Sequence, residues 1–162
     1  MNKSKSIVFE ILRWVVVAAA VLFLLSKFSQ NRISTAAPET VIEAVISKLD
    51  MSEMQEANNR MIKRLYGLDP EKYESCILYY PTTNMGAEEL LIVKLSDMSQ
   101  QDEVRIAVEK RLDTQKTSFD GYGVNQYDML TKNSVIEIRG NYLLFVVHPA
   151  SAAAAQAFLN AL

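Results

Sequence analysis

The sequence predicts an α+β domain that follows an N-terminal transmembrane helix. Residues 14–25 are twelve consecutive apolar residues. After residue 70, short apolar runs typical of strands alternate with longer stretches of helical periodicity. The chain has 162 residues with five Gly and four Pro. Its length fits one domain of common size, and its composition excludes a collagenous or wholly disordered protein.

The apolar segment 7–28 is expected to cross a bilayer once, as an uncleaved signal anchor. A helix of about twenty residues spans roughly 30 Å, the thickness of a bilayer core. A cleaved signal peptide is disfavoured because the first cluster of small residues, 34–37, lies too far beyond the apolar run. Lys3, Lys5 and Arg13 lie on the N-terminal side of the apolar run 14–25, and Lys27 and Arg32 lie beyond it. This excess places residues 1–6 in the cytoplasm and the domain outside it, at the cell membrane.

Residues 29–37 are predicted to form a polar linker and residues 38–162 an extracytoplasmic domain. Of the 17 basic and 19 acidic side chains, five basic and one acidic precede residue 38. The domain therefore keeps 12 basic and 18 acidic side chains, a net charge of about −6. Because such a domain repels phosphate groups, nucleic-acid binding is not expected.

Two helices are expected at the start of the domain. Pro38 suits the first helical position, and Val41, Val45 and Leu49 then recur on one face. Ser52, with Gln55 three positions later, forms a capping-box pattern that predicts the start of the second helix.

Two strand hairpins, each leading into a helix, make up the rest of the domain. The Gly140-Asn141 pair suits a type II′ turn in the second hairpin. The resulting order is α-α-β-β-α-β-β-α, with a four-stranded, mostly antiparallel sheet built from two ββα units. The expected strands are 76–80, 90–95, 135–139 and 142–147, with helices after Ser99 and over 151–161 and a short helical piece over 125–131.

The single cysteine and single histidine limit the chemistry of the chain. Cys76 alone excludes an internal disulfide, and with His148 it offers too few ligands for a zinc or iron–sulfur site. No metal or other cofactor is expected. Cys76 is interpreted as a small buried apolar residue, His148 as a surface residue at a strand end, and the pair Glu88-Glu89 as structural.

The loop after the first predicted strand is the best candidate for a binding surface. It is long for a hairpin and carries polar groups that a tight turn does not need, and binding residues concentrate in loops on rigid scaffolds. An ordinary solvated loop is the alternative interpretation. The candidate residues are Tyr80, Thr82, Thr83 and Asn84 in this loop, Tyr122 in a glycine-rich segment, and Arg139 and Asn141 at the other hairpin tip.

Three stretches of the sequence carry a resemblance to a known family. They are 61–68 (MIKRLYGL), 79–94 with its YYPTTNM and EELLIVK motifs, and 139–147 (RGNYLLFVV). Together they resemble the uncharacterised "domain of unknown function 4358" family, whose members are small membrane-anchored or lipid-anchored proteins of Gram-positive bacteria. The resemblance implies a location in the cell envelope and an association with machinery that acylates surface polymers. It implies no activity for any residue.

The sequence therefore favours a non-catalytic domain tethered to the membrane. The first hypothesis is an interaction or accessory domain for another envelope protein, including surface-polymer acylation machinery. The alternative is a module that binds a small solute or a polymer at the membrane surface. An enzyme is the third class, placed last because no nucleophile elbow, metal cluster or phosphate-binding loop stands in the sequence.

Overall fold

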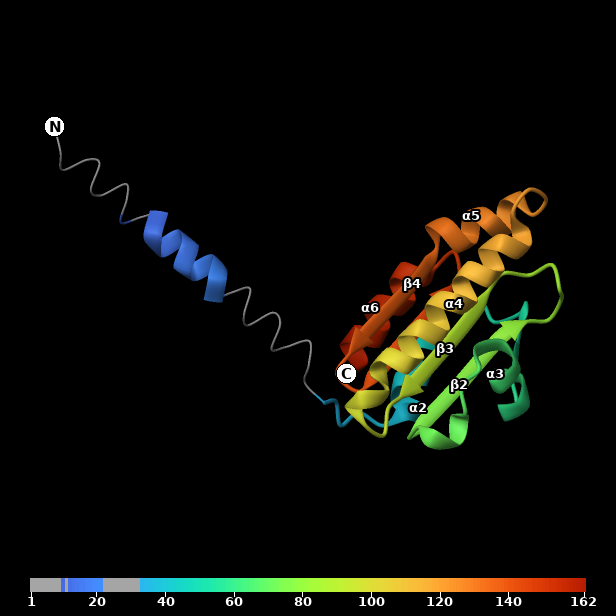
Figure 1. Cartoon of the computed structure of the whole chain (residues 1–162), viewed down its shortest axis with the longest axis horizontal. Helices are drawn as coiled ribbons and strands as arrows, with labels where there is room; N and C mark the ends of the chain where they lie inside the picture. The colour runs from blue at the N-terminus through green and yellow to red at the C-terminus, as the bar shows by residue number, and fades with distance from the viewer. Residues whose placement is uncertain (1–9, 11, 22–32) are drawn as a thin grey trace. The chain divides into compact units, whose positions relative to one another are not determined.

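The computed structural model describes residues 10, 12–21 and 33–162 of the chain (Figure 1). The chain divides into two units, residues 1–32 and residues 33–162. In the first unit, residues 12–21 are helical, and Nη2 of Arg13 lies 3.2 Å from Oε2 of Glu10. The second unit has the α+β architecture expected from the sequence, and it is called the domain below.

The domain is built around one antiparallel sheet of five strands in the order β1-β2-β3-β5-β4. The central strands β3 and β5 pair along their whole length, with Leu91 opposite Phe145. The strands are β1 (Met54–Glu56), β2 (Ser75–Pro81), β3 (Glu89–Lys94), β4 (Ser134–Arg139) and β5 (Tyr142–Val147).

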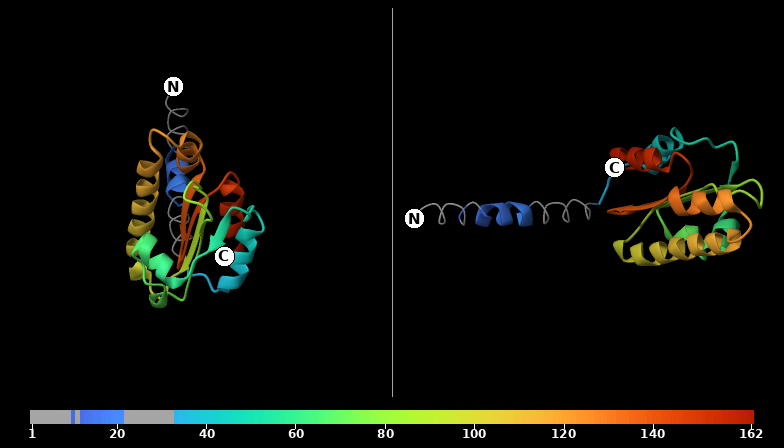
Figure 2. Two further views of the ribbon diagram at one scale, coloured as in Figure 1. Left: turned by 90° about the vertical axis from the view of Figure 1, so that its right-hand side faces the viewer. Right: turned by 90° about the horizontal axis from the view of Figure 1, so that it is seen from above.

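Helices cover both faces of this sheet (Figure 2). α3, α4 and α5 pack on one face, and α2 and α6 pack side by side on the other. The helices are α2 (Pro38–Ile46), α3 (Asn59–Tyr66), α4 (Gln101–Phe119), α5 (Val124–Lys132) and α6 (Ser151–Ala161), with short 3-10 turns η1 (Pro70–Lys72) and η2 (Met98–Gln100).

The central strands are apolar at successive positions because both of their faces are buried. In β3, Leu91 and Val93 belong to the core beneath α3, α4 and α5. Leu90 and Ile92 belong to the core beneath α2 and α6. The strands expected over 90–95 and 142–147 are present as β3 and β5, the central part of the sheet.

The predicted sheet of four strands is wrong, because residues 54–56 add β1 at one edge. Gln55 of β1 lies opposite Tyr80 of β2. The predicted helix start at Ser52 is therefore also wrong, and α3 begins at Asn59. Its N-cap is Asn58, whose side chain accepts the backbone N–H of Met61 at 3.0 Å. A strand of three residues is too short to show the alternation that identifies strands in a sequence.

Both predicted hairpins are present, but the helices that follow them lie on opposite faces of the sheet. α4 packs on the face that carries Leu91, whereas α6 packs on the face that carries Leu144. In the second hairpin Gly140 has a φ of 54°, and Asn141 has no positive φ. This combination agrees with the type II′ turn expected from the sequence.

The chain enters the domain beside its C-terminal residue. The backbone N–H of Ser34 donates to Oδ1 of Asn141 at 2.8 Å, and the Ser34 hydroxyl donates to the carbonyl of Leu162 at 3.1 Å. The carbonyl of Ala36 accepts the Tyr142 hydroxyl at 2.8 Å. The part of the predicted linker that the structure describes is therefore held against the end of the sheet.

The transmembrane helix in the predicted fold is not found among the residues that the structure describes. Within residues 10, 12–21 and 33–162, no helix combines the length and the apolar character needed to cross a membrane. The described helical stretch 12–21 covers about 15 Å at 1.5 Å per residue. Residues 7–9, 11 and 22–28 of the predicted span lie outside the described residues.

Candidate functional site

A pocket of about 380 Å³ lies between the β2–β3 loop (residues 82–88), β1, α3 and α4. The loop and the end of β2 supply half of its lining, and the two helices supply most of the rest. Its lining residues are Gln55, Met61, Arg64, Leu65, Tyr80, Pro81, Thr82, Thr83, Asn84, Gly86, Arg111 and Gln115.

The pocket differs in charge from the domain that contains it. Arg64 and Arg111 are the charged residues of its lining, which has no carboxylate. The remaining polar groups are the hydroxyls and amides of tyrosine, threonine, asparagine and glutamine. In a domain with a net charge of about −6, this concave surface is a local cationic site.

The base of the β2–β3 loop is fixed by contacts on both sides. Thr82 donates its backbone N–H to the carbonyl of Glu53 at 2.9 Å, and Gln55 Nε2 lies 3.4 Å from the carbonyl of Pro81. Gly86 approaches Pro81 so closely that an added Cβ would lie 2.6 Å from the Pro81 Cβ. The loop therefore holds a defined shape where it forms the pocket.

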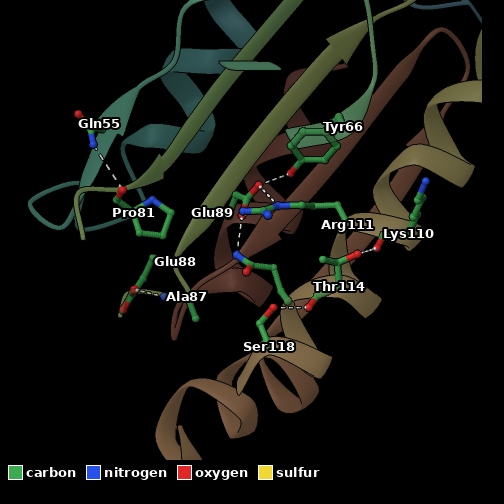
Figure 3. A network of polar contacts seen from close by, with 11 residues as sticks. Gln55, Tyr66, Pro81, Ala87, Glu88, Glu89, Lys110, Arg111, Thr114 and Ser118 are labelled. Atoms are coloured by element: carbon green, nitrogen blue, oxygen red, sulfur yellow. Dashed lines mark hydrogen bonds and ion pairs between the residues drawn. The ribbon is translucent and has the colours of Figure 1, made fainter. Parts of the chain in front are cut away.

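One wall of the pocket rests on a buried ion pair between Glu89 and Arg111 (Figure 3). Glu89 is the first residue of β3 and its side chain is 1% exposed, whereas that of Arg111 in α4 is 12% exposed. Nη2 of Arg111 lies 2.9 Å from Oε2 of Glu89, and Nε lies 3.1 Å from Oε1. This two-nitrogen geometry is the strong form of an arginine–carboxylate contact.

Two further groups complete the hydrogen bonding of the Glu89 carboxylate. The hydroxyl of Tyr66, at the end of α3, donates to Oε1 at 2.5 Å. Nε2 of Gln115, one turn beyond Arg111, donates to Oε2 at 3.3 Å. A buried carboxylate is tolerated only when it is paired and hydrogen-bonded in this way. We call these four residues (Tyr66, Glu89, Arg111 and Gln115) the Glu89 cluster.

The pKa values of the groups around Glu89 follow from burial and charge. Desolvation and the neighbouring Glu89 carboxylate raise the pKa of the Tyr66 hydroxyl well above its ordinary value. Desolvation lowers the pKa of Arg111, but the hydrogen bonds and charge of Glu89 outweigh it, so the net shift is upward. Tyr66 therefore acts as a hydrogen-bond donor and Arg111 as a cation over the whole physiological pH range.

The structure brings together four of the seven binding residues proposed from the sequence. Tyr80, Thr82, Thr83 and Asn84 all line the pocket. Tyr122 does not line it: its side chain is 65% exposed beyond the end of α4, with its ring centroid 6.1 Å from that of Phe119.

The other two proposed residues lie at the opposite end of the sheet. Arg139 pairs with Glu137, with Nε 3.1 Å from Oε1. Asn141 is 7% exposed and accepts the N–H of Ser34, so it holds the incoming chain. The register of β3 and β5 separates the two ends, since Glu89 lies opposite Val147 and Lys94 opposite Tyr142.

Arg64, Arg111 and the burial of Glu89 were not predicted from the sequence. Glu89 has the structural role expected from the sequence, in a buried ion pair. Its burial could have been predicted, because an acidic residue directly before a continuous apolar strand is a signal for a buried carboxylate that needs a partner. No local pattern marks that partner, because Arg111 lies 22 positions further along the chain.

The single histidine and cysteine lie outside this pocket. His148 is 8% exposed, which corrects the expected surface position, and its Nδ1 accepts the N–H of Ala150 at 2.9 Å. Cys76 packs against the core, and burial raises the pKa of its thiol to about 12. In the described part of the chain, no three His, Cys, Asp or Glu side chains are grouped so as to hold a metal ion.

Comparison with known proteins identifies a family and no characterised relative. No curated protein matches the chain, and no solved structure matches it. A family model described as "Domain of unknown function (DUF4358)" matches residues 47–148. This segment contains all five strands, the pocket and the Glu89 cluster, whereas α2 and α6 lie outside it. The matched segment covers more than half of the chain, which therefore belongs to the DUF4358 family.

Proposed function

We propose that the domain is a non-catalytic binding module whose ligand group occupies the pocket beneath the β2–β3 loop. The single observation that carries the proposal is the convergence of side chains from four elements on one concave site of about 380 Å³. Ligand sites in proteins have volumes of about 300–1,000 Å³ and a few convergent polar groups. This site lies in that range.

The lining favours binding over catalysis. General acid–base chemistry requires a group that exchanges a proton near neutral pH, and covalent catalysis requires an activated nucleophile. The lining contains no His, Cys, Asp or Glu, and its threonines have no adjacent base among the lining residues. The groups that remain are suited to hydrogen bonding and to charge recognition.

A pair of loop variants tests the proposal. The full-length chain is screened with a library of small polar molecules, with amide chemical shifts as the readout. Asn84→Trp places an indole in the pocket, whereas Met85→Trp places the same group on the exposed neighbour that does not line it. We expect molecules that bind the wild-type chain to bind the Met85→Trp variant as well, and not to bind the Asn84→Trp variant. Equal binding to both variants would move the site elsewhere.

A protein partner is a second candidate, favoured by an exposed apolar segment. Tyr122, Val124 and Tyr127 lie close together in sequence, and each exposes its side chain at the junction of α4 and α5. Exposed apolar side chains in one region mark interaction surfaces more often than isolated ones do. In this proposal the domain is an accessory subunit of another protein, the first role that the sequence suggested.

Crosslinking in intact cells tests this candidate. The full-length chain is crosslinked and purified, and the attached proteins are identified by mass spectrometry. Val124→Asp should abolish a specific crosslink, whereas Thr117→Asp, on the exposed face of α4, should retain it. A crosslink retained in both variants would exclude this segment as the docking surface.

A further inference from the structure

We propose that the ligand group taken up by the pocket is an oxyanion, a phosphate or a carboxylate, held between Arg64 and Arg111. The inference rests on the proposed binding function and specifies its chemistry. It follows from the hydrogen bonds that Arg111 makes, from the position of Arg64 and from the charge balance of the lining.

Arg111 is held in one orientation and retains donors for a ligand. Its Nε and Nη2 are used by the Glu89 carboxylate (Figure 3), and Arg111 belongs to the lining of the pocket whereas Glu89 does not. Within the described residues, Nη1 makes no hydrogen bond. A guanidinium has five N–H donors in a planar fork, so one side of the fork remains available.

Arg64 supplies the second cation from a separate helix. It lies in the last turns of α3, lines the pocket and forms no ion pair with any described residue. Its neighbour in the sequence, Lys63, is paired with Asp69 at 3.1 Å and does not line the pocket. The two arginines therefore approach the same space from α3 and α4.

The charge balance favours a single anionic group. The buried Glu89 carboxylate neutralises Arg111, whereas Arg64 has no ion-pair partner among the described residues, so the two guanidinium groups of the lining carry an excess of one positive charge over this carboxylate. An oxyanion accepts paired N–H donors from guanidinium groups in the geometry that arginine presents. Thr82, Thr83 and Asn84 add hydroxyl and amide donors around it.

The size of the pocket indicates that the oxyanion is part of a larger solute. A volume of about 380 Å³ exceeds that of a single phosphate or acetate ion several-fold. The hydroxyl and amide groups of the loop suit hydroxyl groups on the rest of such a solute. Because Arg64 and Arg111 would hold only the anionic group of this solute, simple anions are suitable probes of that contact.

The test follows the side-chain Nε–Hε signals of the arginines in the full-length chain by NMR. Inorganic phosphate and acetate are titrated at constant ionic strength against sodium chloride, and glucose serves as a neutral polar probe. We expect phosphate or acetate to shift the Arg111 and Arg64 signals until they saturate. Whichever of the two anions binds more tightly identifies the oxyanion as a phosphate or a carboxylate. Arg64→Gln should weaken that binding by about tenfold or more.

Arg60→Gln is the matched control, because Arg60 lies one turn earlier on α3 and outside the pocket. It should bind the anion as the wild-type chain does. Equal weakening by both variants, or shifts that sodium chloride reproduces, would reduce the effect to nonspecific charge and overturn the inference. If glucose or other neutral molecules bind at the loop and Arg64→Gln does not weaken that binding, the oxyanion inference is wrong but the proposed binding function is retained. If no probe binds at the loop, both the oxyanion inference and the proposed binding function are contradicted.

Discussion

Arg111 of α4 and Glu89 of β3 form an ion pair, in which Nη2 of Arg111 lies 2.9 Å from Oε2 of Glu89. The hydroxyl of Tyr66 in α3 donates to the same carboxylate. A single buried charge thus joins two helices to the first residue of a central strand. The same contact supports the wall of the pocket, so the stability of the domain and the shape of its candidate site depend on one cluster.

Glu89→Leu is expected to lower the free energy of unfolding by about 3–5 kcal/mol, because it leaves the Arg111 guanidinium buried without its partner. Replacing both residues, as Glu89→Leu with Arg111→Met, should cost much less, since no uncompensated charge remains. Urea denaturation of the three chains measures the difference. A double variant no more stable than Glu89→Leu would show that the pair contributes through packing rather than charge.

Cys76 should make the stability of the domain sensitive to alkaline pH. Burial raises the pKa of its thiol from 9.0 to about 12. Below pH 9 the thiol is protonated in both the folded and the unfolded chain, so its contribution to stability is fully present. Between pH 9 and 12 the unfolded chain loses its proton first, and stability falls as the pH rises. Urea denaturation across this range should show a shallower decline for Cys76→Ala than for the wild-type chain.

The reactivity of the same thiol provides an independent check. At pH 8 a pKa of about 12 instead of 9.0 lowers the thiolate fraction by about a thousandfold, and the thiolate is the form that is alkylated. Iodoacetamide should therefore modify the folded chain far more slowly than the chain in urea. Comparable rates in both states would contradict the burial of Cys76.

Gly86→Ala is expected to destabilise the domain by about 1–3 kcal/mol and to disturb the pocket. The added Cβ would lie 2.6 Å from the Cβ of Pro81, which is part of a rigid ring, so the loop must move. The matched control is the triple change of Thr82, Thr83 and Asn84 to Ala. These three side chains are exposed and make no hydrogen bond within the described residues. A collapse of the melting temperature in the control would make the whole loop structural.

Asn141→Ala should release the start of the domain from the sheet. The change removes the acceptor of the Ser34 N–H, at a cost of about 1 kcal/mol. Hydrogen exchange at the Ser34 amide should accelerate, while exchange in the central strands stays slow. Asn84→Ala, at the opposite end of the sheet, should leave the Ser34 amide unchanged, and faster exchange there in both variants would indicate a general loss of stability.

The elements predicted correctly are those whose burial repeats along the chain. The runs around Leu91 and Leu144 are apolar because two layers of helices cover them, and the stripe of Val41 and Val45 gives α2 its helical period. β1 was missed because its signal is only three residues long and the Ser52 and Gln55 pattern imitates a helix start. Local patterns in a sequence predict local structure, whereas the edge strand β1 depends on pairing with the distant strand β2.

The candidate site was predicted only in part, for a related reason. The β2–β3 loop was found because its length and polar residues exceed what a hairpin needs. Arg64, Glu89 and Arg111 were not found, since their proximity arises from packing between α3, α4 and β3, and no spacing in the sequence records it. Asn141 was proposed as a binding residue because it lies at a hairpin tip, and only the contact with Ser34 shows that it holds the incoming chain.

The hydrogen bond between Ser34 and Leu162 makes the domain suitable for circular permutation. Its two ends lie together, so a short linker could join them while a new break is opened elsewhere. Both ends of the domain also lie at the end of the sheet opposite the β2–β3 loop, and the strands between them and the loop are about 20 Å long. A reporter protein fused at either end would therefore stand clear of the loop, and a break opened at Met85 would place both new ends at the rim of the pocket.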